Sequence, residues 1–131
     1  MRTNRLSHQY YCGFGGPQWS NNRRGHYDWC RKTQYASIIY DVRLRAQLVG
    51  ACLKATTDCD AYATVALAQN WYNKNYYREG GSTPKCRLGP RWHDDRAGHK
   101  IWCLTVGPDQ RRNELVGRYK ALQGGPGAQC P

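Results

Sequence analysis

The sequence of 131 residues has few acidic side chains, a single Phe, a single Met and no long apolar run. Lys and Arg number 20 against 9 Asp and Glu, so the formal net charge is +11 at pH 7. A field of that sign attracts phosphate groups, anionic lipid headgroups and acidic protein surfaces. No stretch approaches the ~20 consecutive apolar residues that a membrane-spanning helix needs. The sequence therefore predicts no transmembrane helix and favours a partner with negative charge.

The common catalytic and nucleotide-binding signatures are also missing. The sequence contains no G-x-S-x-G, no Walker-type phosphate loop and no H-E-x-x-H. The usual hydrolase and nucleotide-binding interpretations therefore lack support. No two cysteines have the C-x-x-C spacing of a zinc ribbon or a redox motif, which disfavours metal ligation by thiolates.

Cysteine, in contrast, is plentiful. Seven cysteines spread over the chain predict a disulfide framework in an oxidising compartment, so that the protein is secreted or lies in an organelle. Because seven is an odd number, one thiol stays free or forms an intermolecular disulfide with another chain. The alternative is a reduced intracellular protein with scattered buried cysteines. The cysteines are Cys12, Cys30, Cys52, Cys59, Cys86, Cys103 and Cys130.

The start of the chain bears on the compartment in two ways. It lacks the apolar run of a secretory signal peptide. Arg2 and Arg5 in a first stretch without acidic residues are compatible with an organelle.

The spacing of apolar residues predicts a mainly α fold built on an antiparallel helix pair with disulfide-tied loops. The first helix is expected from about residue 29 to 49, with Asp28 as its cap and Gly50 at its end. The second is expected to start at Asp58 or Asp60 and to reach about residue 76. The short link between them makes an antiparallel arrangement natural.

The rest of the chain is expected to have less regular structure. Lys100–Val106 has a strand-like pattern, and a short C-terminal helix is predicted from Pro108 or Asp109 to Leu122. We predict one domain over 1–131, consisting of a Gly-rich loop region at 1–27, a helix-pair core at 28–86, and a loop plus C-terminal helix extension at 87–131.

The glycine-rich segment at 11–17, YCGFGGP, is the best local signal for chemistry. Successive glycines let backbone carbonyls turn inward, as a hard cation such as calcium requires. Further motifs follow it in order: D-x-C at 28–30, C-D at 59–60, YNKNYY at 72–77 and P-K-C at 84–86. In this order the motifs resemble those of the secreted phospholipase A2 family, over roughly residues 10–86.

The resemblance implies a disulfide, a metal site and a catalytic remnant. Cys12 and Cys30 would form a disulfide that ties the glycine loop to the first helix. The backbone carbonyls of Tyr11, Gly13 and Gly15 would hold calcium, and Asp60 would orient the catalytic histidine.

The sequence departs from the family where the catalytic His-Asp pair should stand, because Thr33 and Gln34 occupy those positions. A threonine hydroxyl cannot deprotonate water near neutral pH as an imidazole does. The neutral amide oxygen of Gln34 removes a full charge from the calcium site. We therefore expect no cofactor, or weakly bound calcium.

Two helix cysteines of the family are missing as well. Ala36 and Ala66 stand at the expected positions. This leaves Cys59 to pair elsewhere, for instance with Cys52.

Histidines outside this motif are weaker candidates for chemistry. His93 stands next to Asp94 and Asp95, and His26 stands two residues before Asp28. Neighbouring residues point in different directions on a helix or a strand, so they seldom act together. A polar loop is the commoner role for such a segment. His93 and His26 are the residues that a rearranged hydrolase centre would use.

Basic residues interleaved with aromatic ones form three clusters. Charge attracts phosphate or carboxylate groups, and aromatic rings stack on bases or lie at a lipid interface. Together the clusters favour a protein partner or an anionic surface, either phospholipid or nucleic acid. The cations are Arg23, Arg24, Arg31 and Lys32 around Tyr27 and Trp29; Arg87, Arg91, Arg96 and Lys100 around Trp92 and Trp102; and Arg111, Arg112, Arg118 and Lys120 in the last helix.

These observations favour binding over catalysis. We expect a non-catalytic, phospholipase-A2-like basic scaffold that acts as a subunit of a larger assembly or on an anionic surface. One alternative is an active calcium-dependent phospholipase or other hydrolase with a rearranged centre. The other is a nucleic-acid-binding basic protein, although no DNA- or RNA-binding motif accompanies the charge.

Overall fold

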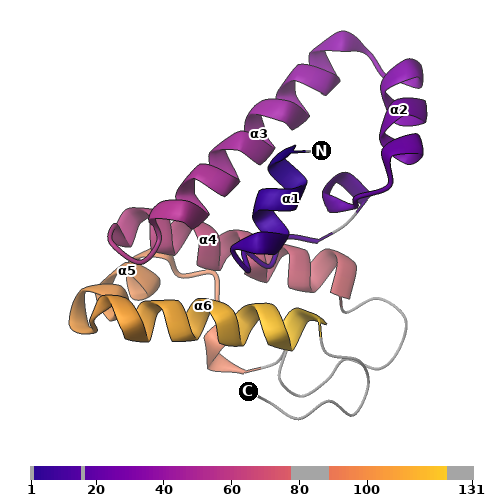
Figure 1. The fold of residues 1–131 in the computed structure, drawn as a ribbon. Coiled ribbons are helices and arrows are strands. Elements are labelled where there is room, and N and C mark those ends of the chain that lie inside the picture. The colour runs from indigo at the N-terminus through magenta and orange to yellow at the C-terminus, as the bar shows by residue number, and fades with distance from the viewer. Residues whose placement is uncertain (1, 16, 78–88, 124–131) are drawn as a thin grey trace.

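The computed structural model describes residues 2–15, 17–77 and 89–123. Within these ranges the chain is mainly helical and forms no strand (Figure 1). The mainly α fold with disulfide-tied loops that the sequence predicts is therefore confirmed. The α-helices are α1 (Arg2–Gln9), α2 (Arg23–Lys32), α3 (Tyr35–Lys54), α4 (Cys59–Tyr72), α5 (Arg96–Thr105) and α6 (Pro108–Gln123), and shorter helical turns are η1 (Pro17–Trp19), η2 (Asn73–Tyr77) and η4 (Pro90–Trp92).

The helices α3 and α4 form the predicted pair: a tight turn joins them, and they diverge from it (Figure 1). Asp58 caps α4, because its Oδ1 accepts hydrogen bonds from the backbone N–H groups of Asp60 at 2.9 Å and Ala61 at 3.3 Å. The predicted start of this helix is confirmed. The predicted start of the last helix at Pro108 is also confirmed.

The helix α4 lies at the centre of the fold and packs against α3, α5 and α6. Tyr62 and Tyr72 on α4 are buried in the main apolar cluster. The Phe14 ring lies 4.8 Å from the Trp19 ring and 5.8 Å from the Tyr72 ring, measured between centroids. The segment between α1 and α2 therefore supplies the aromatic side chains that cover one end of α4.

Two disulfides tie the helices together. Cys12 bonds to Cys52 near the end of α3, and Cys59 at the start of α4 bonds to Cys103 on α5. Cys30 is free and exposed on α2. Cys86 and Cys130 lie outside the described residues.

The predicted Cys12–Cys30 bond is therefore wrong, and so is a bond between Cys52 and Cys59. Cys12 is fully buried against the C-terminal part of α3, whereas Cys30 lies on a helix without a buried residue.

The predicted single helix over 29–49 is wrong at both ends. Thr33 breaks it, because its backbone is extended and its hydroxyl donates to the Trp29 carbonyl at 2.6 Å. The helix α2 begins at Arg23 with Asn22 as its cap, so Asp28 caps nothing. The helix α3 continues past Gly50, because its last turns carry the buried Val49 and Cys52.

Two segments predicted to be non-helical are helices. Residues 1–27 contain α1, whose buried residues Asn4 and Ser7 are polar, so apolar periodicity gave no sign of it. The strand-like segment Lys100–Val106 lies largely in α5. Its helical conformation places His99 and Cys103, four residues apart, on one buried face.

The disulfide assignment predicts a specific pattern of stability. Replacing Cys12 and Cys52 together by Ala should lower the free energy of unfolding by about 2–5 kcal/mol, because the bond closes a long loop in the unfolded chain. Cys30→Ser should leave stability almost unchanged. Chemical denaturation of the two variants and the parent protein measures both effects. Peptide mapping without reduction that finds Cys12 linked to Cys30 would contradict the assignment.

Candidate functional site

The glycine-rich loop packs tightly against α4. Gly13 has a positive φ of 73°, and a Cβ built there would lie 2.8 Å from Gln69 Nε2. Gln69 Nε2 in turn donates a hydrogen bond of 2.7 Å to the Cys12 carbonyl. Close packing between the loop and α4 thus accounts for the glycine at position 13.

Tyr11, Gly13 and Gly15, whose carbonyls the resemblance assigns to calcium, all lie in this loop. Gly13 and Gly15 are buried, whereas Tyr11 is exposed. Asp60 stands nine residues before Gln69, about 13 Å away along α4. No group of three or more His, Cys, Asp or Glu side chains suited to a metal ion occurs in the part of the chain that the structure describes.

Asp60 instead forms an ion pair with Lys100. Its Oδ1 lies 2.9 Å from Lys100 Nζ, and the hydrogen bond from Lys100 holds the pKa of Asp60 below its usual value. Arg96 donates from Nη2 to the Asp60 carbonyl at 3.2 Å. These contacts join the start of α4 to α5.

Thr33 and Gln34, which stand where the resemblance implies a catalytic pair, lie just before the start of α3, at the end far from the loop. The loop is attached to α3 at Cys52, eighteen residues after Gln34, which corresponds to about 27 Å of helix. The chain therefore does not bring these positions to the loop or to Asp60.

His93 belongs to a second polar region. Its ring stacks on that of His99, with centroids 3.9 Å apart and planes 7° from parallel. His93 Nδ1 accepts from the Asp95 N–H at 3.1 Å, and His99 Nε2 donates to the His93 carbonyl at 2.9 Å. Burial lowers the pKa of His99.

Asp94, next to this pair, is also held by neighbours. Its carboxylate accepts from Lys74 and from Asn70. The hydrogen bond from Lys74 lowers the pKa of Asp94. The His-Asp-Asp segment thus fastens the chain between η4 and α5 to the end of α4.

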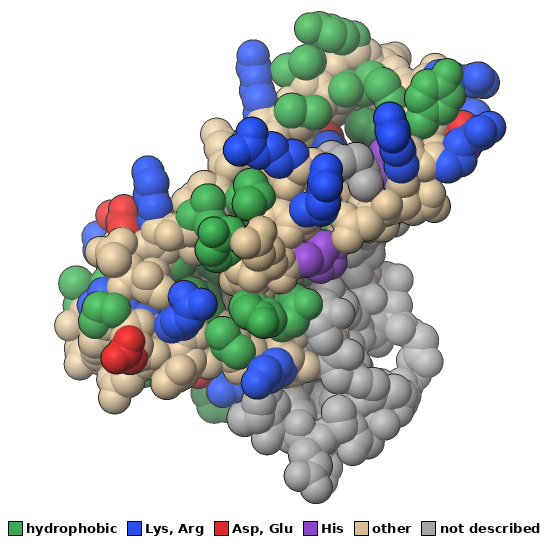
Figure 2. Space-filling view, in the orientation of Figure 1, with side chains coloured by type: hydrophobic (Ala, Val, Ile, Leu, Met, Phe, Trp, Pro, Cys, Tyr) green, Lys and Arg blue, Asp and Glu red, His purple; other side chains and the backbone are tan. Residues whose placement is uncertain are grey.

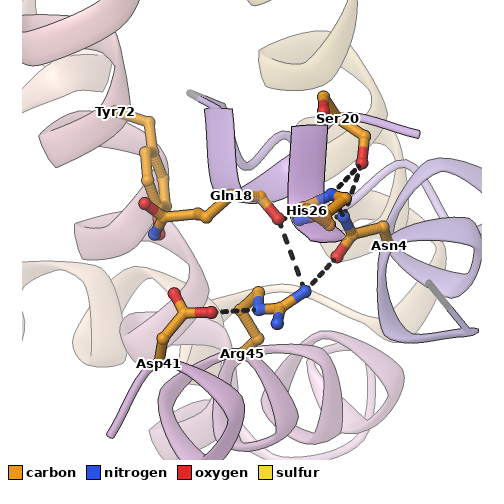
Figure 3. Close-up of polar contacts among 7 residues, drawn as sticks. All are labelled: Asn4, Gln18, Ser20, His26, Asp41, Arg45 and Tyr72. Atoms are coloured by element: carbon orange, nitrogen blue, oxygen red, sulfur yellow. Dashed lines mark hydrogen bonds and ion pairs between the residues drawn. The ribbon is translucent and has the colours of Figure 1, made fainter. Parts of the chain in front are cut away.

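His26 lies apart from both regions, in a polar network at the base of α2 (Figure 3). His26 Nε2 lies 2.6 Å from the Ser20 carbonyl, so this nitrogen carries a proton and donates it. Asn4 Nδ2 donates to the same carbonyl at 2.7 Å and to the Gln18 carbonyl at 2.8 Å. Asn4, from α1, therefore fixes the segment that leads into α2.

Arg45 connects this network to α3 (Figure 3). Its Nη1 donates to Asn4 Oδ1 at 2.9 Å, and its Nε lies 2.9 Å from Asp41 Oδ2. Both side chains of the Asp41–Arg45 pair are largely shielded from solvent, which strengthens the pair relative to an exposed one. The direction of α3 relative to α1 depends on these contacts.

A cavity of about 420 Å³ lies between α2 and α3, beside this network. Its size is that of a small-ligand pocket. His26, at its wall, has its Nε2 committed to a backbone carbonyl. The residues that line it are Gln18, Ser20, Asn22, Gly25, His26, Trp29 and Asp41.

We call residues 23–47 the arm; it consists of α2, the link to α3, and α3 up to the residue before Leu48, which packs against the core. Val49 and Cys52 are the only buried residues of α3, and α2 has none. Figure 1 shows the arm projecting from the layer formed by α4, α5 and α6. Large aromatic side chains are exposed on it: Tyr27, Trp29, Tyr35 and Tyr40.

The arm is also basic. Figure 2 shows apolar side chains gathered over it, with Lys and Arg side chains around them. Arg24 pairs with Asp28, and Arg31 lies over the Tyr27 ring at 5.9 Å. Among the described residues no ion-pair partner occurs for the remaining exposed cations of the arm, which are Arg23, Arg31, Lys32 and Arg43.

Most cations of the other two basic clusters form ion pairs or hydrogen bonds within the fold. Arg91 lies 2.9 Å from Glu114, and Lys100 pairs with Asp60. Arg111 donates to the carbonyls of Cys103 and Thr56 at 2.8 and 3.0 Å. Arg118 is buried over the Trp92 ring, and its burial lowers its pKa. Arg87 lies outside the described residues. The first cluster alone combines several unpaired cations with exposed aromatic rings.

No protein-family model, curated protein or solved structure matches this chain significantly. No helix among the described residues is long and apolar enough to cross a bilayer.

Sequence reasoning missed the residues that orient the arm. Asn4, Gln18 and Arg45 belong to no motif, and Asn4 carried no signal at all. The spacing of Asp41 and Arg45, four residues apart on a predicted helix, was a readable sign of an ion pair.

Asn4→Ala should lower the free energy of unfolding by about 1–3 kcal/mol, because it removes one hydrogen bond from each of the Ser20 and Gln18 carbonyls and the Asn4 acceptor of the Arg45 guanidinium. Urea denaturation followed by tryptophan fluorescence measures the loss. Asn21→Ala, at an exposed position nearby, is the matched control and should have little effect. Equal stability of the two variants would show that the network does not hold the arm.

Stability should decrease as the pH falls below about 6.5, the value from which burial lowers the pKa of His99. Below that pH His99 binds a proton in the unfolded chain but not yet in the folded protein, so protonation favours unfolding. The charged and titratable groups that act on folded His99 are His93, Arg118 and Asp95. His99→Gln should flatten this dependence in urea denaturation at several pH values. NMR titration should find that the His99 imidazole of the parent protein titrates below 6.5, and titration above that value would contradict the prediction.

Proposed function

We propose that this protein is a non-catalytic binding protein that docks through the arm, as a subunit of a larger protein assembly. The observation that carries the proposal is the difference between the three basic clusters. In two of the clusters most cations bind groups within the fold, whereas the cations on α2 face solvent next to Tyr27 and Trp29.

The composition of the arm favours a protein partner. Tyr, Trp and Arg dominate the residues that contribute most to binding at protein interfaces. The arm exposes these residue types together with the aliphatic Val42. A nucleic-acid groove would combine its cations with a recognisable binding motif, which this sequence lacks.

The positions of the candidate catalytic groups support a role without chemistry. His26, His93 and Asp60 lie in three separate contact networks, and each has a polar partner within the fold. A general base must lie within hydrogen-bonding distance of the group that it deprotonates and is usually oriented by a third residue. These three residues do not form such a set.

The scaffold and the compartment are parts of the same proposal. The proposed scaffold is a phospholipase-A2-like one built on the α3–α4 pair, and its disulfide pairing differs from the one that the resemblance implies. The two disulfides are consistent with an oxidising compartment. We propose that the protein is secreted and that it binds its partner without calcium.

The size of the native protein tests the proposal. In gently prepared extracts and secretions of the cells that make it, the 15.0 kDa chain should elute from a sizing column with an assembly several times its own mass. Trp29→Ser combined with Arg31→Glu should release it, because the pair removes one aromatic anchor and reverses one charge of the arm.

Leu104→Ser combined with Arg112→Glu is the matched control, since it makes the same kinds of change at exposed positions on α5 and α6. It should leave the assembly intact. Elution of the parent protein as a monomer, or release by both pairs alike, would contradict the proposal. Calcium-dependent hydrolysis of phospholipid that is lost in His93→Ala or His26→Ala would show an enzyme instead.

A further inference from the structure

The helix α3 has two apolar faces, and the protein covers only one of them. Leu48, Val49, Ala51 and Cys52 pack into the main core. The other face is left outside. We call it the α3 seam, and it consists of Tyr35, Ile39, Val42, Ala46 and Leu53.

The seam has the spacing of a coiled-coil contact line. When the buried Val49 is counted with them, its positions follow one another at alternating intervals of four and three residues. Such a line is narrow, and it suits the groove of another helix. A helix that lies on a lipid surface has a broader apolar face.

The seam is exposed along α3 on both sides of Val49, where the same line of the helix is buried. The exposed fraction is 78% for Tyr35, 48% for Val42 and 48% for Leu53. The distance from Tyr35 to Leu53 along the helix is about 27 Å. Covering these side chains requires a partner element of comparable length, such as a second helix.

Gly50 is a second sign of a missing neighbour. It lies inside α3, where glycine costs about 1 kcal/mol relative to alanine. A Cβ at this position would meet nothing within 4 Å, so packing within this chain does not require glycine there. By helical periodicity Gly50 lies beside the seam, on the same flank as Ala36. Small residues on that flank let another backbone approach closely.

Charge along this flank indicates the kind of partner. Arg43 and Lys54 are eleven residues apart, about three turns, so both lie on the flank of Ala36 and Gly50. The carboxylate nearest to Arg43 in sequence, Asp41, lies on another side of α3 and is bound to Arg45. The one nearest to Lys54, Asp58, caps α4. A partner helix with carboxylates beside its apolar line would complement Arg43 and Lys54, as charges at such flanking positions do in coiled coils.

We propose that the α3 seam binds an acidic amphipathic helix of a partner protein, packed side by side with α3. This inference rests on the proposed function and names the structure that the arm takes up within the assembly. A second copy of this chain is disfavoured, because it would bring like charges on the two seams together and add the repulsion of two chains at +11 each.

A peptide pair tests the proposal on the full-length protein. The first is a labelled helical peptide as long as α3, 20 residues, with Leu and Ile at the contact positions and Glu beside them. The second carries Lys in place of each Glu. Fluorescence anisotropy should find that the acidic peptide binds at least about tenfold more tightly, and that salt weakens it.

Substitutions at exposed seam positions provide the matched variants. Val42→Gln with Ala46→Gln should weaken the acidic peptide about tenfold, whereas Ile101→Gln with Leu104→Gln on α5 should leave it unchanged. Arg43→Glu with Lys54→Glu should reverse the preference between the peptides. Circular dichroism checks that each variant remains helical.

Several outcomes would overturn the inference. These are equal binding of both peptides, no binding of either, dimerisation of the chain through the seam in analytical ultracentrifugation, and binding to anionic vesicles that the seam substitutions abolish. If the peptides fail while the arm variants still release the chain from its assembly, the inference is wrong and the proposed function stands. If the native chain belongs to no assembly, the proposed function is wrong.

Discussion

The disulfide between Cys12 and Cys52 determines where α3 leaves the core, and the rest of the structure depends on that point. It joins the glycine-rich loop to the last turns of α3, and Gln69 on α4 holds the same loop from the other side. The C-terminal end of α3 is therefore clamped, while the part before Val49 extends outward and contains no fully buried residue. The Asn4–Arg45 contacts then set the direction of this extension. One covalent bond and one polar network together convert an ordinary helix pair into a scaffold with a projecting arm.

The high positive charge of the chain is divided between two roles. On α5 and α6, cations join separate elements: Lys100 pairs with Asp60 on α4, Arg111 donates to the Cys103 carbonyl on α5, and Arg118 donates to the Arg91 carbonyl in η4. Buried or partly buried cations of this kind need partners, and the fold supplies them. On the arm the cations have fewer partners and stand among exposed aromatic rings. Net charge alone would not have separated these roles, because it counts a cation that holds the fold together in the same way as one that faces solvent.

The sequence predicted those elements for which local signals agree with the apolar pattern. Asp58 is both a cap and the residue before an apolar stripe, and Pro108 opens a segment of high helical tendency, so both helix starts were correct. The break at Thr33 depends on one side-chain hydrogen bond, and α1 buries polar residues, so neither could be read from periodicity. Disulfide partners are chosen by tertiary packing, which spacing does not encode. The candidate site was only partly predictable for the same reason: the aromatic and basic residues of α2 were visible, but the exposure of α3 was not.

The outward face of α3 also affects the colloidal behaviour of the protein. In isolation the molecule keeps an apolar line in water, and the repulsion between its copies is what keeps those lines apart. This repulsion acts over a Debye length of about 10 Å at 0.1 M ionic strength, and it shortens to about 3 Å at 1 M. Added salt therefore removes the barrier between copies while it strengthens apolar contacts. Concentrated preparations of the free chain will be most monodisperse at low ionic strength, the reverse of the usual practice of adding salt to keep a basic protein dispersed.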